Sequence, residues 1–460
     1  MNGTMRFLLL CSAAFLWTAC VGQWSPLGSG MNNAVRGVFY DDVEGVLYAA
    51  GDFTEAGDSI VNGIAWWDGT HWHPLGGGVQ PGWVAVEDVR KQGGEIVIGG
   101  HFGWVDSVPG TPHVASWNGA EWQPCLPSGG ATGGNVLGVE FIDSLLYVFG
   151  SFANLGTIDC KNVGYRSGGE WHSTLREGLM LPGESDISCV ARYQGDLYVG
   201  GNFEIAPGLH EIGQVQGDSL VAVGGGIHGD SWLWDMIVYD GRLYASGFFG
   251  GSGNAASMIM AWDGTQWINP FPQVVVNAQV RDMTVHDDAL YFTGTMHPVG
   301  SSMVSYVGKF DGEQICLLGG GNAYVGAIAV GGGYAYCGTL IGGSIPFGDD
   351  SVIVRRIAAL DLSYPPDTCI SVQTSMLEPV AQNAMRLYPN PAEDHVTLAG
   401  LEAASGGTVQ VVDVLGRMAT GPAPITSPTM HIDTRQLLPG SYAVRISGKD
   451  GIWTSAFLKR

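Results

Sequence analysis

The sequence predicts an all-β fold, a seven-bladed β-propeller followed by a small immunoglobulin-like (Ig-like) β-sandwich, from three observations. A strand motif recurs seven times, Asp-Gly or Asn-Gly turns separate apolar segments, and the C-terminal part alternates apolar and polar residues with period two. The 460 residues include 72 glycines, about 16% against a usual value near 7%. Since 45% of the residues are hydrophobic, these glycines belong to the turns of a packed protein rather than to a disordered chain.

The charge of the chain limits its partners. It carries 20 basic and 43 acidic residues, a formal net charge of −23. Nucleic acids and anionic membranes select basic surfaces, so we expect neither as a partner.

The repeat is anchored by a strand of the form Leu-Tyr-x-x-Gly-x-Phe, clearest at residues 47–53, 96–102, 146–152, 197–203 and 243–249 and weaker near 290–296 and 335–340. Repeats of this length are typical of propeller blades. The motif therefore predicts seven blades between residues 23 and 362. The anchoring glycines are Gly51, Gly100, Gly150, Gly201, Gly247, Gly294 and Gly338.

The first repeat shows four strands, at 34–40, 46–53, 64–67 and 71–75, and the outer two are joined by an Asp-Gly hairpin turn. Its outer strand, Trp72 to Gly76, has the same pattern as residues 24–28, before the first inner strand. The seventh repeat ends at 357–361 with no outer strand after it. We therefore expect the N-terminal strand to complete the last blade and close the ring. The repeats resemble those of secreted kelch-like propellers, although the double-glycine pattern of that family is only loosely kept, so the resemblance implies architecture and no activity.

Residues 1–22 have the features of a signal peptide. Arg6 supplies the positive charge, residues 7–17 form a largely apolar segment too short to span a bilayer, and small residues follow up to Gly22. An alternative is a lipoprotein signal in which Cys20 is lipidated. No later segment has 18 uninterrupted apolar residues, so no transmembrane segment is expected in the mature chain.

The segment 385–460 contains period-two strands at 396–398, 409–413 and 441–446. Four motifs run through it: Tyr388-Pro389-Asn390-Pro391, a strand end with Gly416, a turn with Gly440 and Tyr442, and a basic end with Lys459. This segment resembles the type A C-terminal sorting domain of the type IX secretion system of Bacteroidetes. The resemblance implies export to the medium or the outer cell surface, with the outer-membrane translocon as a partner. The alternative is an unrelated Ig-like sandwich. Residues 363–384, which show no periodicity, are the expected linker.

Six of the eight cysteines lie outside the signal region, which permits up to three disulfides without indicating their pairing. Cys189 falls in an expected inner strand, so we predict a buried free thiol there. No Cys-x-x-Cys pair and no spaced calcium loop occur, so we expect no metal and no cofactor.

The catalytic candidates are few. Counting back 12 residues from the anchoring glycines places Asp88, Asp235 and Asp282 at one position of the inner strands, around an expected central channel. Arg281 directly precedes Asp282, and by the same count Arg36 lies three residues before this position in blade one. These five residues are the candidates if the protein is an enzyme. The alternative is that the aspartates accept hydrogen bonds from backbone amides.

Two functions remain open. The leading hypothesis is a secreted or surface-displayed binding or scaffold protein whose extracellular ligand, a glycan or a protein, is unknown. The alternative is an extracellular propeller hydrolase or lyase acting on polysaccharide, based on the aspartates and the many aromatic residues.

Overall fold

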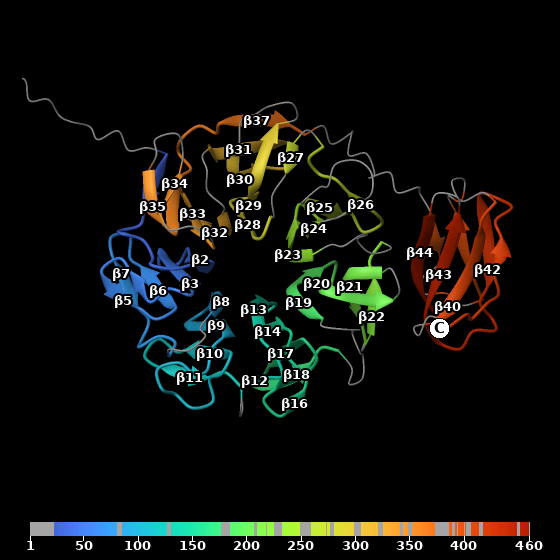
Figure 1. Cartoon of the computed structure of the whole chain (residues 1–460), viewed down its shortest axis with the longest axis horizontal. Coiled ribbons are helices and arrows are strands. Elements are labelled where there is room, and N and C mark those ends of the chain that lie inside the picture. The colour runs from blue at the N-terminus through green and yellow to red at the C-terminus, as the bar shows by residue number, and fades with distance from the viewer. Residues whose placement is uncertain are drawn as a thin grey trace, which may run out of the picture.

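The computed structural model is built of antiparallel strands (Figure 1). It describes residues 23–459 except 81–84, 127–129, 176–184, 207–208, 218, 225–231, 249–258, 273, 277–279, 299–304, 321–324, 341–343, 348–351, 373–385, 389–391, 393, 400, 402–405, 414–416 and 449–450. The expected signal peptide lies outside the described residues. Within them, no helix is long and apolar enough to cross a membrane.

The described residues before the C-terminal part form seven sheets of at least four strands, placed around a common centre (Figure 1). We call them blades 1 to 7. The first three are β2 (Val35–Asp41), β3 (Val46–Gly51), β6 (Ile64–Trp67) and β7 (Trp72–Pro74); β8 (Ala85–Gln92), β9 (Glu95–His101), β10 (Val114–Trp117) and β11 (Trp122–Pro124); and β13 (Val136–Ile142), β14 (Leu145–Gly150), β17 (Val163–Ser167) and β18 (Glu170–Ser173).

Blades 4 and 5 are β19 (Asp186–Tyr193), β20 (Asp196–Ala206), β21 (Leu209–Gln216) and β22 (Ser219–Ala222); and β23 (Trp232–Tyr239), β24 (Arg242–Phe248), β25 (Ile259–Trp262) and β26 (Trp267–Ile268). Blade 6 contains β28 (Met283–His286), β29 (Ala289–Pro298), β30 (Ser305–Phe310) and β31 (Gln314–Gly320), with β27 (Val274–Val276) beside β29. Blade 7 is β32 (Val325–Gly331), β33 (Tyr334–Thr339), β36 (Ile357–Asp361) and β1 (Trp24–Pro26). The predicted all-β propeller class is confirmed.

Short strands lie on the loops of blades 1, 3 and 7: β4 (Glu55–Ala56), β5 (Ser59–Ile60), β12 (Ala131–Thr132), β15 (Asn154–Leu155), β16 (Ile158–Asp159), β34 (Ser344–Phe347) and β35 (Val352–Arg355).

The N-terminal strand closes the ring as predicted. β1 pairs antiparallel with β36, and Trp24 lies opposite Leu360. Blade 7 therefore takes its outer strand from the other end of the propeller, and both ends of the ring are joined by backbone hydrogen bonds.

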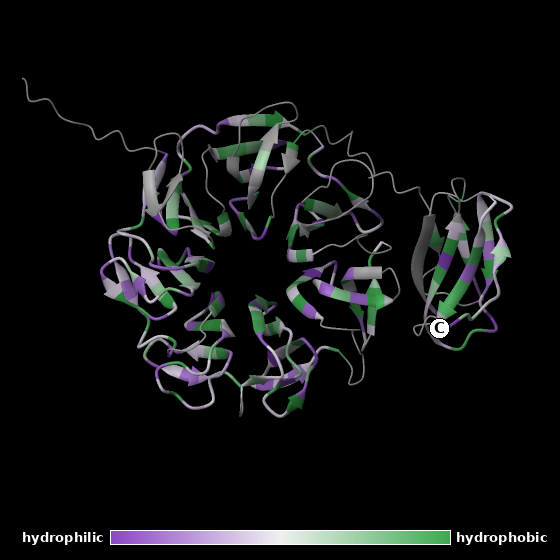
Figure 2. Cartoon of the chain, in the orientation of Figure 1, coloured by the Kyte–Doolittle hydropathy of each residue, from purple (hydrophilic) through white to green (hydrophobic). Residues whose placement is uncertain are grey.

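The core lies between the blades rather than within each one. One buried cluster joins Ala50 and Ile64 of blade 1 to Val86 and Ile98 of blade 2, and another joins blades 7 and 1. Figure 2 shows the matching hydrophobic segments along the strands of the ring. Each blade thus covers the apolar face of its neighbour.

The repeated glycine is required by a close backbone approach. The inner strands β2, β8, β13, β19, β23 and β32 each contain a β-bulge opposite the second strand. A Cβ on Gly100 would lie 2.1 Å from the Ala85 carbonyl oxygen, and the other anchoring glycines from Gly51 to Gly247 meet the equivalent oxygen. In blade 7 the expected anchor is off by one residue, because Thr339 rather than Gly338 pairs with Val325 before the bulge.

A tryptophan on the outer strand ties each of four blades to the preceding outer strand. The Nε1–H groups of Trp72, Trp122, Trp171 and Trp267 donate to the carbonyl oxygens of Leu27, Leu75, Cys125 and Val223 at 2.9–3.1 Å. In three of the four cases the acceptor is followed by a glycine with positive φ: Gly28, Gly76 and Gly224. A Cβ on Gly76 would lie 2.8 Å from the Trp122 Nε1.

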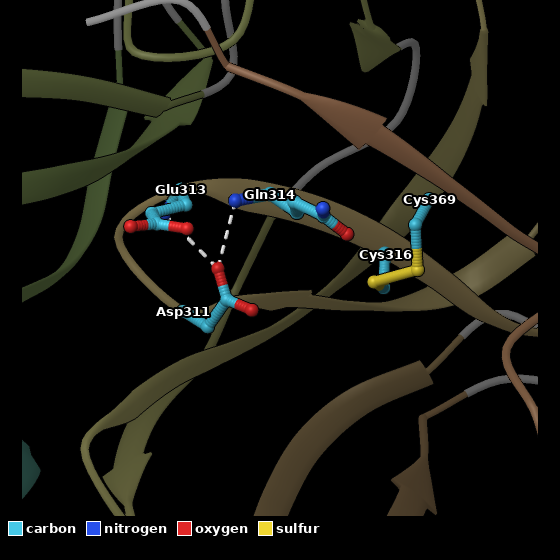
Figure 3. The surroundings of a disulfide bond; sticks show 5 residues. All are labelled: Asp311, Glu313, Gln314, Cys316 and Cys369. Atoms are coloured by element: carbon cyan, nitrogen blue, oxygen red, sulfur yellow. Dashed lines mark hydrogen bonds between the residues drawn. A yellow bond between two sulfur atoms is a disulfide. The ribbon is translucent and has the colours of Figure 1, made fainter.

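Part of the expected linker is a strand. Residues Thr368–Ser371 form β37, which pairs with β31 at the outer edge of blade 6, and Cys369 is bonded to Cys316 (Figure 3). The preceding hairpin turn is held by Asp311, whose Oδ1 accepts from the amides of Glu313 and Gln314. The linker prediction is therefore wrong for 368–371. This strand of 4 residues is too short for its alternation to be recognised in the sequence. Residues 373–384 of the linker lie outside the described residues.

Among the described cysteines, Cys125, Cys160, Cys189 and Cys337 are free and buried. The prediction for Cys189 is confirmed.

The C-terminal part contains two sheets that share one apolar core. The first is β38 (Arg386–Tyr388), β39 (His395–Ala399) and β42 (Thr429–Asp433). The second is β41 (Ala423–Pro424), β40 (Thr408–Asp413), β43 (Gly440–Gly448) and β44 (Gly451–Lys459). Val396 and Leu398 pack with Val411 and Val444 between them.

The tryptophan contact predicts the effect of Gly76→Ala. Gly93→Ala is the matched control, because Gly93 has nearly the same φ (+59° against +61°) but no neighbour within 4 Å of an added Cβ. Both variants incur backbone strain of about 1 kcal/mol. Only Gly76→Ala also displaces a buried indole, at a further cost of about 1–3 kcal/mol in unfolding free energy. Denaturant unfolding measures this difference, and equal destabilisation of the two variants would contradict it.

The disulfide predicts two results for the mature protein. After denaturation without reductant, four of the six cysteines of the mature chain should react with an alkylating agent. The disulfide between Cys316 and Cys369 should appear in a non-reduced peptide map. A Cys316→Ser/Cys369→Ser double variant should lose up to about 4 kcal/mol, the entropy of a closed loop with a sequence separation of 53 residues. Six reactive thiols in the secreted wild-type protein would contradict the bridge.

Candidate functional site at the centre of the ring

Figure 1 shows the inner strands of the blades around the centre of the ring, and in six of them the β-bulge adds one extra residue. In blade 6, β28 pairs with β29 without a register shift, and Arg281 is grouped with these residues because it directly precedes Asp282, as Glu87 precedes Asp88 and Trp234 precedes Asp235. We call this set the bulge belt. Its members, in blade order, are Arg36, Glu87, Leu137, Ser188, Trp234, Arg281 and Gly326.

The three candidate aspartates directly follow belt residues, and each connects its blade to the next one. The Oδ2 atoms of Asp88, Asp235 and Asp282 accept from the backbone amides of Val139, Met283 and Ile328 at 2.7–3.1 Å. The Oδ1 atoms of Asp88 and Asp235 accept from the following amide of their own strand at 2.8 Å. The aspartates therefore satisfy backbone amides across blade junctions, which is the alternative that the sequence left open.

Burial raises the pKa of these carboxyls. It raises the pKa of Asp88 to about 6, although the charge of Arg90 opposes the shift and Glu140 adds to it. Burial also raises the pKa of Asp235 and of Asp282, and the negative charge of Asp235 adds to the shift at Asp282. The Arg90 guanidinium bonds to Asp88 at 2.5 Å and to Glu140 at 2.9 Å, so its positive charge lies between the two carboxylates.

The structure corrects the position of Arg36. It lies one residue before the aspartate position, in the belt with Glu87 and Arg281, and Gly37 takes the place of the aspartate. The count from the glycine was wrong because the first hairpin of blade 1 is two residues longer, turning at 42–45 where blade 2 turns at 93–94.

Arg36 is held by two carboxylates. Its Nε and Nη2 donate to the two Oδ atoms of Asp52 at 2.6 and 2.8 Å, and its Nη1 donates to Glu87 at 3.3 Å. The hydrogen bond to Asp52 holds the pKa of Arg36 above its usual value. Burial raises the pKa of Glu87 against the opposing charges of Arg36 and Arg281, so these side chains form one electrostatic group.

Blade 5 adds aromatic side chains to the belt. The Arg281 guanidinium lies 5.0 Å from the ring centre of Trp234, in cation–π contact. Trp232, two residues earlier, is 57% exposed, whereas Leu233 between them is buried. Both tryptophans therefore point away from the blade core.

Sequence reasoning missed Asp52, Glu87, Glu140 and the two tryptophans as members of the site. Six of the belt residues are identified as the extra residue of a bulge, and a bulge becomes visible only in the strand register. Among the residues that the structure describes, no group of three His, Cys, Asp or Glu side chains is arranged to hold a metal ion.

The sorting motifs come together at one edge of the C-terminal domain. Gly440 pairs with Lys459 across β43 and β44, and Lys459 also bridges to Ala392, just after the Pro-rich motif. The Tyr442 hydroxyl donates to the Leu438 carbonyl oxygen at 2.9 Å. Tyr388 ends β38, while Pro389, Asn390, Pro391 and Gly416 lie outside the described residues.

Residues 386–460 match the family model of the secretion system C-terminal sorting domain. This match indicates that the C-terminal domain is a sorting domain for export by the type IX secretion system. This domain directs export, so the protein is secreted or displayed on the outer cell surface. A search of curated proteins finds no match.

Similar solved structures include two propellers. The WD40 β-propeller domain of Doa1 is 12% identical with a TM-score of 0.42, and the match covers 74% of this chain and 98% of that one. The β-propeller domain of Cps50 (Swd1) from Myceliophteria thermophila is 9% identical with a TM-score of 0.40, covering 74% and 99%.

The raised pKa of Asp88 predicts a pH dependence. The native state binds this proton more tightly than the unfolded state, so the contribution of Asp88 to stability is greatest below about pH 4 and falls as the pH rises to about 6. The unfolding free energy of the wild type minus that of Asp88→Asn should therefore fall by up to about 3 kcal/mol over this window. Urea unfolding at several pH values measures it. If the difference in unfolding free energy between the two proteins stays constant or grows with pH, the pKa of Asp88 is not raised.

Proposed function

We propose that this protein is a seven-bladed, kelch-like propeller that acts outside a Bacteroidetes cell as a binding or scaffold protein. In this proposal residues 1–22 are removed as a signal peptide, residues 23–362 form the working domain, and residues 385–460 engage the outer-membrane translocon. The observation that carries the proposal is the sorting-domain match at 386–460. In this proposal, the propeller binds an extracellular glycan or protein.

The geometry of the candidate residues favours binding over catalysis. Asp88 and Asp235 use both carboxylate oxygens on backbone amides, so neither has an oxygen reserved for a substrate proton. The belt residues other than the buried Gly326, in contrast, are partly exposed side chains of varied chemistry. Such a surface serves recognition.

The hydrolase or lyase hypothesis keeps one supporting observation, the raised pKa of Asp88, Asp235 and Asp282, since a general acid needs a proton near neutral pH. Its test is turnover of a polysaccharide panel by the wild type and by Asp88→Asn, Asp235→Asn and Asp282→Asn. Turnover that disappears in a folded variant would replace the binding proposal with the enzymatic one.

Export depends on the sorting domain in this proposal. The full-length chain should deliver the propeller to the medium or cell surface, whereas a chain ending at residue 384 should accumulate in the periplasm with its signal peptide removed. Mass spectrometry of cell fractions measures both the location and the two chain ends. Equal amounts of both chains in the medium would contradict the role of the domain, and an intact residue 1–22 segment on the exported protein would contradict the signal peptide.

A further inference from the structure

Beside the bulge belt, blade 5 has an aromatic surface that is not buried in the packing between blades. Trp232 and Trp234 alternate with the buried Leu233 on β23, and Trp232 leaves 57% of its surface exposed. An exposed indole at the start of an inner strand costs hydration free energy without contributing to the core. Flat aromatic faces of this kind bind the apolar C–H face of a sugar ring as they bind other ring faces.

Charged groups lie beside Trp234. Arg281 lies against the Trp234 ring, and its charge also acts on Glu87, whose carboxylate is bonded to Arg36. Asp52 holds Arg36 through two hydrogen bonds. The belt thus presents planar donors and carboxylate acceptors next to an aromatic face. Paired donors and acceptors suit neighbouring hydroxyl groups, which donate and accept at once.

The charge of the molecule selects among carbohydrate ligands. Both carboxylates near Arg36 offset its positive charge, and the whole chain has a net charge of −23. A polyanionic glycan would meet repulsion from the rest of the surface. A neutral, hydroxyl-rich glycan would not.

We propose that Trp232, together with the belt residues Trp234, Arg281, Arg36 and Glu87, forms a binding site for a neutral carbohydrate. A sugar ring stacks on the exposed Trp232 indole while its hydroxyls bond to the guanidinium and carboxylate groups. This inference rests on the proposed binding function and names its ligand class.

The test is isothermal titration calorimetry of the mature secreted protein with neutral cello-, laminari-, xylo- and manno-oligosaccharides and with oligogalacturonate as the anionic probe. We expect at least one neutral oligosaccharide to bind, with little change at raised salt. Trp232→Ala and Arg281→Gln should each weaken the binding at least about fivefold, since truncating a central aromatic or arginine contact removes more than about 1 kcal/mol. Trp232→Phe should keep most of the affinity because the ring face remains.

Trp104→Ala is the matched control. Trp104 is also exposed, at 50%, but it lies on the loop after β9 of blade 2. Its substitution should leave the affinity unchanged, and thermal melting of every variant should match the wild type. The inference is overturned if no neutral oligosaccharide binds, if only oligogalacturonate binds, or if Trp104→Ala weakens binding as much as Trp232→Ala. Each of these outcomes leaves the proposed function intact, because that proposal fails only if the exported protein binds neither glycan nor protein at the cell surface.

Discussion

The whole propeller depends on the contact between neighbouring blades. Each four-stranded sheet has two faces and buries them only against the next sheet, so a blade is stable only within a closed ring. Indole hydrogen bonds from Trp72, Trp122, Trp171 and Trp267 fix this contact at the rim. Aspartate bonds to neighbouring backbone amides fix it near the centre. Part of the excess of glycine follows from the same contact, because the rim glycines admit the indoles, whereas the anchoring glycines admit the bulged inner strand of their own blade.

The candidate binding surface is a consequence of this packing. The bulge that directs Asp88 or Asp235 toward the next blade also leaves one extra residue at the centre of the ring. The blade packing does not determine which amino acid stands at that position. The belt therefore contains residues as different as Gly326 and Trp234. A fixed framework with a variable inner position suits the proposed binding function, and the sorting domain places the propeller outside the cell.

The repeat could be predicted from the sequence because each blade repeats turns with strict backbone requirements, such as the Asp-Gly hairpin before Trp72. Closure by the N-terminal strand was predictable because Trp24 and Trp72 share a pattern. The site was predicted only in part. The aspartates were found by counting, but the same count misplaced Arg36, since hairpin length varies between blades. Glu87 and Trp234 escaped because a bulge has no signature in a single strand, and β37 escaped because its pairing partner lies about 50 residues earlier in the chain.

Hydrogen exchange on the mature protein with and without residues 23–28 tests the dependence on ring closure most directly. This deletion removes both the outer strand of blade 7 and the Leu27 carbonyl that accepts the Trp72 indole. We predict that amide protection falls in β36 and in β7, on both sides of the junction, and that the loss extends to the inner strands of blades 7 and 1. Protection that is lost only in β36 would contradict the account, because it would show that each blade is stable without its neighbour.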